Sequence, residues 1–520
     1  MKIAANRAIA APKEPFRPLA PILVLAALAP DQANADEAMA ARVRALTPEL
    51  EAYVAKGMSD FDLPGLAMGI VVGDDLVYAK GFGLRRKDGE PVDPETVFQI
   101  GSTTKAFLAT TLAIAVDRKK LDWDDRVVDY DPDFQMKDPW VTSEFRVADM
   151  LAQRSGLPPY ANDAVGLLGF DQTAMIRSLR HVEPVSSFRS TFAYTNITHM
   201  LAQRVVARAM GEAEWDDVVR AEIFAPLGMT DSSFTADAIE AAADTTAGYL
   251  WTAEGTAEVP FTPIFPYGFG AAGAINSTVE DMAKWLRLHL GDGAFEGRRI
   301  VSEASLAVTK TPRVAISDRL SYAMGWVVQS TPNGRIIWHN GGTTAFGAFV
   351  GTAPDHDLGI VVLTNETNVG LPDAIGEWTF DRLMGNPRVD HVAARLTAAR
   401  KSDADSDATF AAPAAPRPGP PLAPLAASFD SPVFGEAAVT AGDDGLVLAL
   451  KETGARLKLA PWNGDVFTAS LVPEGRFAAV AANLGPLPMG FAQFQADETG
   501  KLATLRLTMS DGQVYDFARQ

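Results

Sequence analysis

The chain has 520 residues, of which 47% are hydrophobic and 9% aromatic, so it is long enough to form two or three well-packed domains. Its formal net charge of −19 argues against a protein that tracks nucleic-acid phosphates and against attraction to an anionic membrane, because both need a basic surface. The sequence contains no cysteine, which excludes disulfides, cysteine catalysis and thiolate metal ligands. We therefore expect a small-molecule or short-peptide partner and no nucleic acid, and the sequence leaves the oligomeric state open.

Residues 1–35 have the pattern of a cleavable export signal. Basic residues between Lys2 and Arg17 precede the apolar run "LAPILVLAALAP", and "ANA" at positions 33–35 offers small residues for cleavage. This run falls short of the ~20 apolar residues that a spanning helix requires, and no later stretch of the sequence approaches that length. The pattern predicts a periplasmic or secreted protein without a stable membrane span.

Residues 36–390 are expected to form the first domain. A helix is predicted near Ala40 to Lys56, and "GLAMGIVVGDDLVYAKGFG" predicts a β-hairpin because two apolar runs flank Gly73-Asp74-Asp75. Helical periodicity dominates from Ser102 to about Met210, and strand-like runs return between Arg335 and Asn365. The pattern indicates an α/β (α+β) domain: an antiparallel sheet flanked by helices and interrupted by a largely helical insertion, with a closing helix over Ala374–Gly385.

Residues 391–425 are expected to link this domain to a second one. The stretch from Lys401 to Leu425, "KSDADSDATFAAPAAPRPGPPLAPL", is rich in Ala, Pro and Asp, which predicts a semi-extended chain. Residues 426–520 contain short alternating apolar runs such as "LVLALK" and "LATLRLTM", separated by turn residues. A small antiparallel β domain is therefore expected at the C-terminal end.

The stretch "FQIGSTTKAF" places a serine and a lysine three residues apart at the start of an apolar helix. Residues at this spacing share a helix face, so Ser102 and Lys105 can come within reach of each other, and Ser102 lies at the positive end of the helix dipole. Taken alone the pattern is weak, because a serine that opens a helix is most often an N-cap. Two further motifs follow in the chain, Tyr194-Thr195-Asn196 and then His339-Asn340-Gly341 with Gly342 behind it.

This ordered set resembles the serine hydrolases of the class C beta-lactamase, D,D-carboxypeptidase and esterase superfamily, whose pattern is S-x-x-K, Y-x-N and then K-T-G or H-x-G. The connecting stretches "LAQRSGLPPY", "AAGAINSTVEDMAKWL" and "WHNGGTTAFGAFV" resemble that superfamily as well, over about residues 40–385. The resemblance implies a beta-lactamase/transpeptidase-like fold, and the C-terminal part is similar to the lipocalin-like domain appended to many such hydrolases.

The resemblance also implies roles for the motif residues. Ser102 is the nucleophile that accepts the acyl group, and Lys105 helps to remove its proton. Tyr194 is the phenolic general base and acid, and Asn196 hydrogen-bonds Lys105 and the substrate. Lysine and tyrosine both have ordinary pKa values near 10, so the pKa of one of them must fall toward about 7 for it to act as a base at neutral pH. The sequence leaves open which of the two is the base.

The third motif departs from the beta-lactamase pattern, because His339 stands where those enzymes usually carry lysine. A mostly neutral imidazole gives less positive charge to anchor a β-lactam carboxylate, so beta-lactamase activity is expected to be secondary at most. Gly341 and Gly342 are expected to let the substrate approach an edge strand closely. By resemblance, the Gly342 N–H joins that of Ser102 as the oxyanion hole, and His339 and Gly341 belong to the substrate-binding set.

These features predict an exported serine hydrolase that works through an acyl-enzyme on an ester or a short-peptide amide, with D-amino-acid-containing and linearised cyclic peptides among the substrates considered. The alternative is a penicillin-binding-like protein that binds a peptide or muropeptide with little or no turnover. No metal or cofactor is expected, because the other histidines lack the one-turn spacing of a zinc-binding helix. The carboxylate pair Asp124-Asp125 is more typical of a solvated connection than of a metal site.

Overall fold

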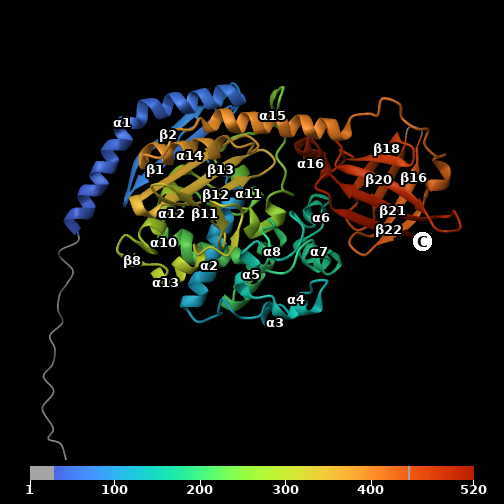
Figure 1. Ribbon diagram of the computed structural model, residues 1–520, viewed down its shortest axis with the longest axis horizontal. Helices are drawn as coiled ribbons and strands as arrows, with labels where there is room; N and C mark the ends of the chain where they lie inside the picture. The colour runs from blue at the N-terminus through green and yellow to red at the C-terminus, as the bar shows by residue number, and fades with distance from the viewer. Residues whose placement is uncertain (1–28, 443–444) are drawn as a thin grey trace, which may run out of the picture.

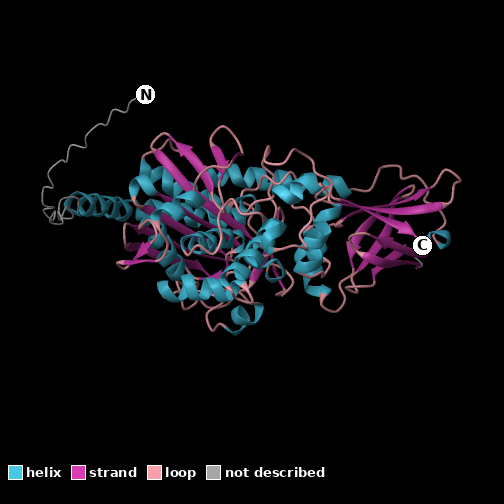
Figure 2. Cartoon of the chain, turned by 90° about the horizontal axis from the view of Figure 1, so that it is seen from below, coloured by secondary structure: helices cyan, strands magenta, loops and turns pink. Residues whose placement is uncertain are grey.

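The computed structural model describes residues 29–442 and 445–520, which form two packed units (Figure 1 and Figure 2). The centre of the first unit is an eight-stranded sheet in which every neighbouring pair is antiparallel. Its strands, in spatial order, are β2 (Asp75–Gly83), β1 (Gly65–Val72), β14 (Leu358–Thr364), β13 (Gly347–Ala353), β12 (Gly334–Gly342), β11 (Val327–Thr331), β10 (Leu320–Tyr322) and β9 (Val314–Ala315). The predicted hairpin is confirmed as β1 and β2.

Helices cover both faces of this sheet. The strands β1, β13 and β14 are buried along their whole length, which explains why their sequences are continuous apolar runs rather than alternating ones. One face packs against α1 (Ala29–Phe61) and α14 (Leu371–Met384), as Figure 1 shows above the sheet. The other face packs against α12 (Val279–Leu290). The closing helix α14 ends at Gly385, whose positive φ of 76° terminates the helix.

A largely helical insertion separates the hairpin from the later strands, as the sequence predicts. It begins with α2 (Thr104–Asp117) and includes α8 (Ile197–Met210), which packs against α2. The insertion also contains α3 (Val127–Tyr130), α4 (Pro139–Glu144), α5 (Val147–Leu151), α6 (Asp163–Leu167), α7 (Gln172–Ser178), α9 (Trp215–Val219), α10 (Ala225–Leu227), α11 (Ala236–Ala241) and α13 (Glu303–Thr309). Short strand pairs punctuate it: β3 (Phe98–Gln99) with β6 (Asn276–Ser277), β4 (Gly248–Thr252) with β5 (Gly255–Val259), and β7 (Ala294–Phe295) with β8 (Arg298–Arg299).

The segment after α14 differs from the prediction of a semi-extended linker. It is helical as α15 (His391–Phe410), and only residues beyond 410 run without regular structure until a 3-10 turn at Ala423–Leu425. The Asp390 side chain caps the helix by accepting the Ala393 N–H at 3.1 Å, and Val392 is fully buried against the first domain. This capping and docking stabilise a helix that its composition alone does not predict, and proline-rich chain follows only after Phe410.

The C-terminal unit is a closed antiparallel barrel, which lies on the right in Figure 1. Its strands are β15 (Ala427–Ser431), β16 (Gly435–Ala441), β17 (Leu446–Leu450), β18 (Arg456–Asn463), β19 (Val466–Leu471), β20 (Gly490–Ala496), β21 (Leu502–Met509) and β22 (Val514–Arg519), with α16 (Phe477–Leu484) between β19 and β20. Buried and partly exposed residues alternate along β17 and β20, because one face of each strand fills the barrel. The expected β domain is confirmed.

The barrel packs directly on the helical insertion. A single hydrophobic cluster runs through both units, and the rings of Phe170 and Phe434 meet across the boundary with centroids 5.7 Å apart. The side chain of Tyr515, on β22, donates a hydrogen bond of 3.1 Å to Asn162 Oδ1 beside α6. The second domain is therefore docked next to the segment that precedes Asp163.

The predicted export signal falls mostly on residues 1–28, which lie outside the described residues. Its expected cleavage site at positions 33–35 lies in the first turns of α1. Within residues 29–442 and 445–520, no helix is both long and apolar enough to cross a membrane.

Candidate active site

Ser102 and Lys105 lie where a 3-10 turn (Gly101–Thr103) runs into α2. Ser102 remains partly exposed, whereas the Lys105 side chain is fully buried beneath it. Lys105 Nζ is 3.0 Å from Ser102 Oγ, 2.8 Å from Asn196 Oδ1 and 2.6 Å from the carbonyl oxygen of Ala272. The predicted pairing of serine and lysine is thus present in the fold, with two fixed oxygen acceptors on the far side of the amine.

Tyr194 and Asn196 reach the same site from the segment that leads into α8. The Tyr194 ring centroid lies 4.9 Å from Lys105 Nζ, and burial raises the pKa of the Tyr194 hydroxyl against the smaller, opposite effect of the nearby Ser102 side chain. The segment is fixed from behind by Gln153, whose Oε1 accepts the Thr195 N–H at 2.6 Å and whose Nε2 donates to the Thr195 carbonyl at 3.0 Å. Two hydrogen bonds to the backbone of Thr195 therefore hold the segment that places Tyr194 beside the nucleophile.

The C-terminal end of β12 closes the site on its other side. Gly342 is exposed at this end, and a Cβ built on Gly101 would lie 2.7 Å from the Gly342 nitrogen. A Cβ on Gly341 would meet the Ile100 carbonyl oxygen at 1.9 Å and the Ser102 nitrogen at 3.2 Å. Glycine at positions 101 and 341 therefore lets the strand and the Ser102 turn approach closely, with the Gly342 and Ser102 N–H groups on adjacent stretches of backbone.

The expectation of an edge strand needs correction. β12 lies inside the sheet, between β13 and β11. Its pairing with β11 ends at Val327↔Trp338, however, while its pairing with β13 continues to Gly342↔Gly347. Residues 339–342 therefore pair with β13 on one side and have no strand on the other, because the pairing with β11 does not reach them. Only this part of β12, next to the site, forms an edge of the sheet.

His339 does not line the substrate cavity. It is 2% exposed, with its Nδ1 2.5 Å from the Asn340 carbonyl oxygen and its Nε2 3.0 Å from the Tyr322 hydroxyl. A carbonyl oxygen only accepts, so Nδ1 carries the proton and Nε2 accepts from Tyr322. Burial, together with the smaller effect of nearby Lys105, lowers the pKa of His339 to about 3. The imidazole is neutral, as expected, but it supports the wall of the site from behind and is not placed to touch a substrate.

The surroundings shift the pKa values of the two candidate bases, Lys105 and Tyr194, in opposite directions. Burial lowers the pKa of Lys105 to about 7, with Asp163 opposing this fall. Burial instead raises the pKa of Tyr194 well above its usual value, and Tyr322 adds to the rise. At neutral pH a substantial fraction of Lys105 is therefore an uncharged amine, whereas Tyr194 stays a phenol. The two side chains that the sequence left as alternative bases therefore have pKa values shifted in opposite directions.

Asp163 is a site residue that none of the three sequence motifs contains. Its Oδ2 accepts a 2.6 Å hydrogen bond from Asn196 Nδ2, so Asn196 connects Asp163 to Lys105. Burial raises the pKa of Asp163 to about 7, while Asn196 and Lys105 act in the opposite direction. No sequence signal pointed to it, because Asp163 is far from each of the three motifs along the chain and reaches them only through folding.

These residues surround an open cavity of about 540 Å³, called here the serine cavity. Of the predicted set, Ser102, Tyr194, Asn196 and Gly342 line it, while Lys105, His339 and Gly341 lie behind its wall. Aromatic side chains, including Phe192, Phe265 and Phe269, form much of the remaining surface. Polar side chains, among them Asp163, Asn340 and Asn368, line the rest, so the cavity combines aromatic walls with polar groups that can orient an organic substrate.

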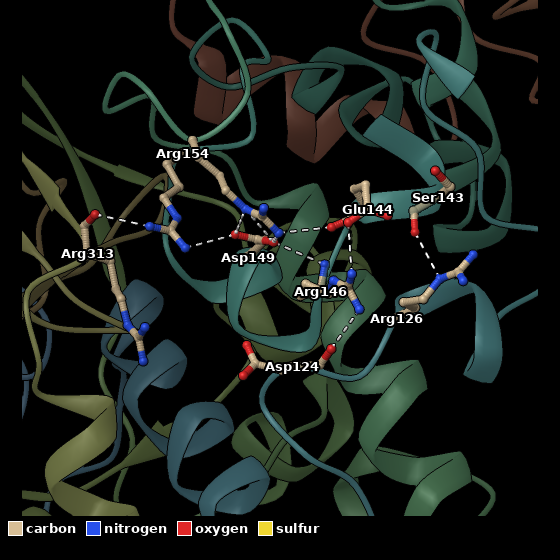
Figure 3. Close-up of polar contacts among 9 residues, drawn as sticks. Asp124, Arg126, Ser143, Glu144, Arg146, Asp149, Arg154 and Arg313 are labelled. Carbon is tan, nitrogen blue, oxygen red and sulfur yellow. Dashed lines mark hydrogen bonds and ion pairs between the residues drawn. The ribbon is translucent and has the colours of Figure 1, made fainter. Parts of the chain in front are cut away.

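A charged network surrounds Asp149 in the helical insertion (Figure 3). The Asp149 carboxylate, 1% exposed, pairs with Arg154 at 3.0 Å and with Arg189 at 2.5 Å. Both arginines flank segments that lead to the site, Arg154 next to Gln153 and Arg189 shortly before Tyr194. The network therefore holds the backbone of the segments that carry Gln153 and Tyr194 and is part of the structural support of the site.

The carboxylate pair Asp124-Asp125 is part of a turn. The Asp125 carboxylate accepts the Asp122 N–H and the Tyr130 hydroxyl, each at 2.7 Å. Within residues 29–442 and 445–520, no group of three or more histidine, aspartate or glutamate side chains could hold a metal ion.

Comparison with known proteins agrees with this geometry. The family model described as "Beta-lactamase" matches residues 50–383. An unguisins hydrolase from Aspergillus campestris is 28% identical over 343 residues, which cover 62% of this chain and 62% of that protein, so the chain spans less than its full length. Penicillin-binding protein 4 from Amycolatopsis lactamdurans is 26% identical over 72% of this chain and 94% of that protein. The octameric penicillin-binding protein homologue from Pyrococcus abyssi has the same fold, with a TM-score of 0.59 at 21% identity, over 91% of this chain and 99% of that one.

Proposed function

This chain belongs to the beta-lactamase family of serine hydrolases, and we propose that it acts as an esterase or peptidase through an acyl-enzyme formed on Ser102. The observation that carries the proposal is the arrangement around Lys105 Nζ. Its three contacts are two fixed acceptors, Asn196 Oδ1 and the Ala272 carbonyl, and the Ser102 hydroxyl. A neutral amine has two N–H groups for the two acceptors, which leaves its lone pair directed at the serine proton.

The proposed acylation follows from this geometry. Neutral Lys105 takes the proton of Ser102 Oγ as that oxygen attacks the substrate carbonyl and forms the new C–O bond. The N–H groups of Ser102 and Gly342 hold the oxyanion, and loss of one such donor costs roughly 10²–10³ in kcat in related chemistry. Tyr194, a phenol at neutral pH, gives its proton to the leaving oxygen or nitrogen as the old bond breaks and regains a proton from Lys105.

Deacylation reverses these roles with water as the nucleophile. Water loses a proton to the lysine–tyrosine pair, attacks the acyl carbonyl and releases the acid, and Ser102 Oγ recovers its proton. Both proposed half-reactions use only the side chains and backbone N–H groups of the protein, together with water. The scheme needs a cavity that holds an acyl group beside Ser102, and the serine cavity provides that space.

The proposed substrates are esters and short-peptide amides, including D-amino-acid-containing and linearised cyclic peptides. The aromatic lining of the serine cavity and the similarity to an unguisins hydrolase support an apolar, peptide-like substrate. The neutral and buried His339 supports a low beta-lactamase activity, because no lysine stands at that position to pair with a β-lactam carboxylate. Export to the periplasm or the medium is proposed from the N-terminal sequence pattern alone.

A hydrolysis panel tests the proposal. Purified protein is assayed with p-nitrophenyl acetate, with linear and cyclic peptides that contain D-amino acids, and with nitrocefin, beside the Ser102→Ala variant. We expect ester or peptide hydrolysis that Ser102→Ala abolishes, and nitrocefin turnover well below it. Binding of peptides without turnover of any substrate would instead favour a penicillin-binding-like role.

A further inference from the structure

A second cavity adjoins the serine cavity and is called here the neighbouring cavity. It measures about 550 Å³, close to the volume of the serine cavity, and the two share Thr344 and Phe265 as lining residues. Thr344 lies two residues after Gly342, so the shared wall continues directly from the strand end that faces Ser102. The two cavities therefore adjoin at Thr344 and Phe265.

The chemistry of the neighbouring cavity favours an apolar group. Its floor and walls include Ile239, Phe261 and Phe346. Its two cationic side chains are already neutralised, since Arg85 pairs with Asp244 at 2.7 Å and Arg86 pairs with Glu258 at 3.1 Å. No excess positive charge is left for a substrate carboxylate.

Acidic side chains at the rim of the neighbouring cavity disfavour negatively charged substrate groups. Glu90 and Glu240 line it as exposed side chains, and they repel an anionic group that approaches. An uncharged aromatic or branched aliphatic side chain meets the apolar walls without opposing charge. The cavity therefore selects by size and apolarity.

The barrel domain completes this cavity. Asn483, on α16, lines it and is itself 4% exposed. Its Oδ1 accepts a 2.8 Å hydrogen bond from the Thr344 hydroxyl, and its Nδ2 donates to the Pro260 carbonyl at 2.8 Å. One buried amide thus ties the barrel to Thr344, in the wall that the two cavities share.

We propose that the neighbouring cavity is a second substrate subsite, built partly by the barrel, which takes a bulky apolar side chain of an extended peptide substrate. This inference rests on the proposed function, because it places the scissile carbonyl at Ser102. The protein then prefers linear peptides with an aromatic or branched residue away from the scissile bond. A peptide too short to reach past Thr344 binds more weakly, because it places no side chain in the neighbouring cavity.

The test measures how well linear peptides protect Ser102 from a fluorophosphonate probe. The peptides are a blocked alanine hexapeptide and its single-phenylalanine variants, each in L and D form. In the full-length protein, at least one phenylalanine position should protect Ser102 at about tenfold lower concentration than the all-alanine peptide, because burying one aromatic side chain contributes at least that factor.

Two variants change the cavity in opposite ways. Phe261→Ala removes an aromatic wall, and Ala247→Trp fills space that Ala247 lines. Each variant is compared with its own labelling rate without peptide, so that any change in the nucleophile cancels. In both, the phenylalanine advantage should fall below about threefold. Trp140→Ala, which removes a 61% exposed aromatic outside both cavities, should keep the full advantage.

The inference is overturned if no phenylalanine position improves protection, or if the improvement survives in both cavity variants. Failure of the proposed function has a different signature, because Ser102 would then not react with the probe even when no peptide is present.

Discussion

Asn196 connects Lys105 to Asp163: its Oδ1 lies 2.8 Å from Lys105 Nζ, and its Nδ2 lies 2.6 Å from Asp163 Oδ2. A buried carboxyl group therefore adjusts the charge of the amine beside the nucleophile without touching it. Lys105 and Asp163 both have pKa values shifted to about 7 by burial, so the proton distribution of the pair changes within the physiological range. The first two predictions follow from this relationship.

Acylation should depend on pH through Lys105. The amine accepts the Ser102 proton only when it is uncharged, and its pKa of about 7 means that the uncharged fraction falls as the pH drops through 7. The rate of the p-nitrophenol burst from p-nitrophenyl acetate should rise with pH, pass its midpoint near pH 7 and then level off. A burst rate that continues to rise toward pH 10 would mean that Lys105 keeps an ordinary pKa.

The Asp163→Asn variant should move this midpoint to lower pH. The Asp163 carboxylate favours the charged form of Lys105, so removing its negative charge lowers the lysine pKa. An asparagine at 163 still offers an oxygen to Asn196 Nδ2, which keeps the hydrogen bond and isolates the effect of charge. Asp318→Asn, at an exposed position, is the matched control and should leave the midpoint in place. An unchanged pH profile in Asp163→Asn would mean that the Asp163 charge does not affect the pKa of Lys105.

Tyr194→Phe should lower the acylation rate by roughly 10²–10⁴, the usual contribution of a general acid or base. The matched control is Tyr322→Phe. Tyr322 is a fully buried tyrosine close to Tyr194, with ring centroids 6.4 Å apart, but it donates to His339 and does not line the serine cavity. Its loss leaves His339 Nε2 without a donor, which should cost about 1–3 kcal/mol in unfolding free energy. Stopped-flow acylation and urea unfolding of both variants check the two effects, and equal rate losses would contradict the role given to Tyr194.

Gly341→Ala should abolish acylation while the fold survives. The new methyl group would lie 1.9 Å from the Ile100 carbonyl oxygen, so the turn that carries Ser102 has to move away from β12. A displacement of that turn separates the two N–H groups proposed for the oxyanion. Gly268→Ala is the control, because a Cβ there meets nothing within 4 Å. The comparison uses the p-nitrophenol burst, with circular dichroism to verify folding, and a full burst in Gly341→Ala would contradict the close-packing argument.

The sequence predicts the three motifs and the sheet with its helical insertion, because residue spacing and apolar periodicity carry that information. It could not reveal Asp163 or the Ala272 carbonyl, whose contacts with the site arise from segments far apart in the chain. His339 shows the same limit: its position in β12 follows the H-x-G pattern, but its direction away from the cavity depends on Tyr322. In α15, an N-cap and two buried residues in its first half, Val392 and Ala399, hold a helix that continues through a segment whose composition favours extended chain.

The most direct test of the account is fluorophosphonate labelling of the purified protein, with peptide mapping by mass spectrometry and with Ser102→Ala and Lys105→Ala as controls. We predict a single labelled residue, Ser102, no label in Ser102→Ala, and labelling slowed by roughly 10²–10⁴ in Lys105→Ala. Labelling of Ser102 at an undiminished rate in Lys105→Ala, or no labelling of Ser102 in the unaltered protein, would contradict the proposal that the buried amine activates this serine.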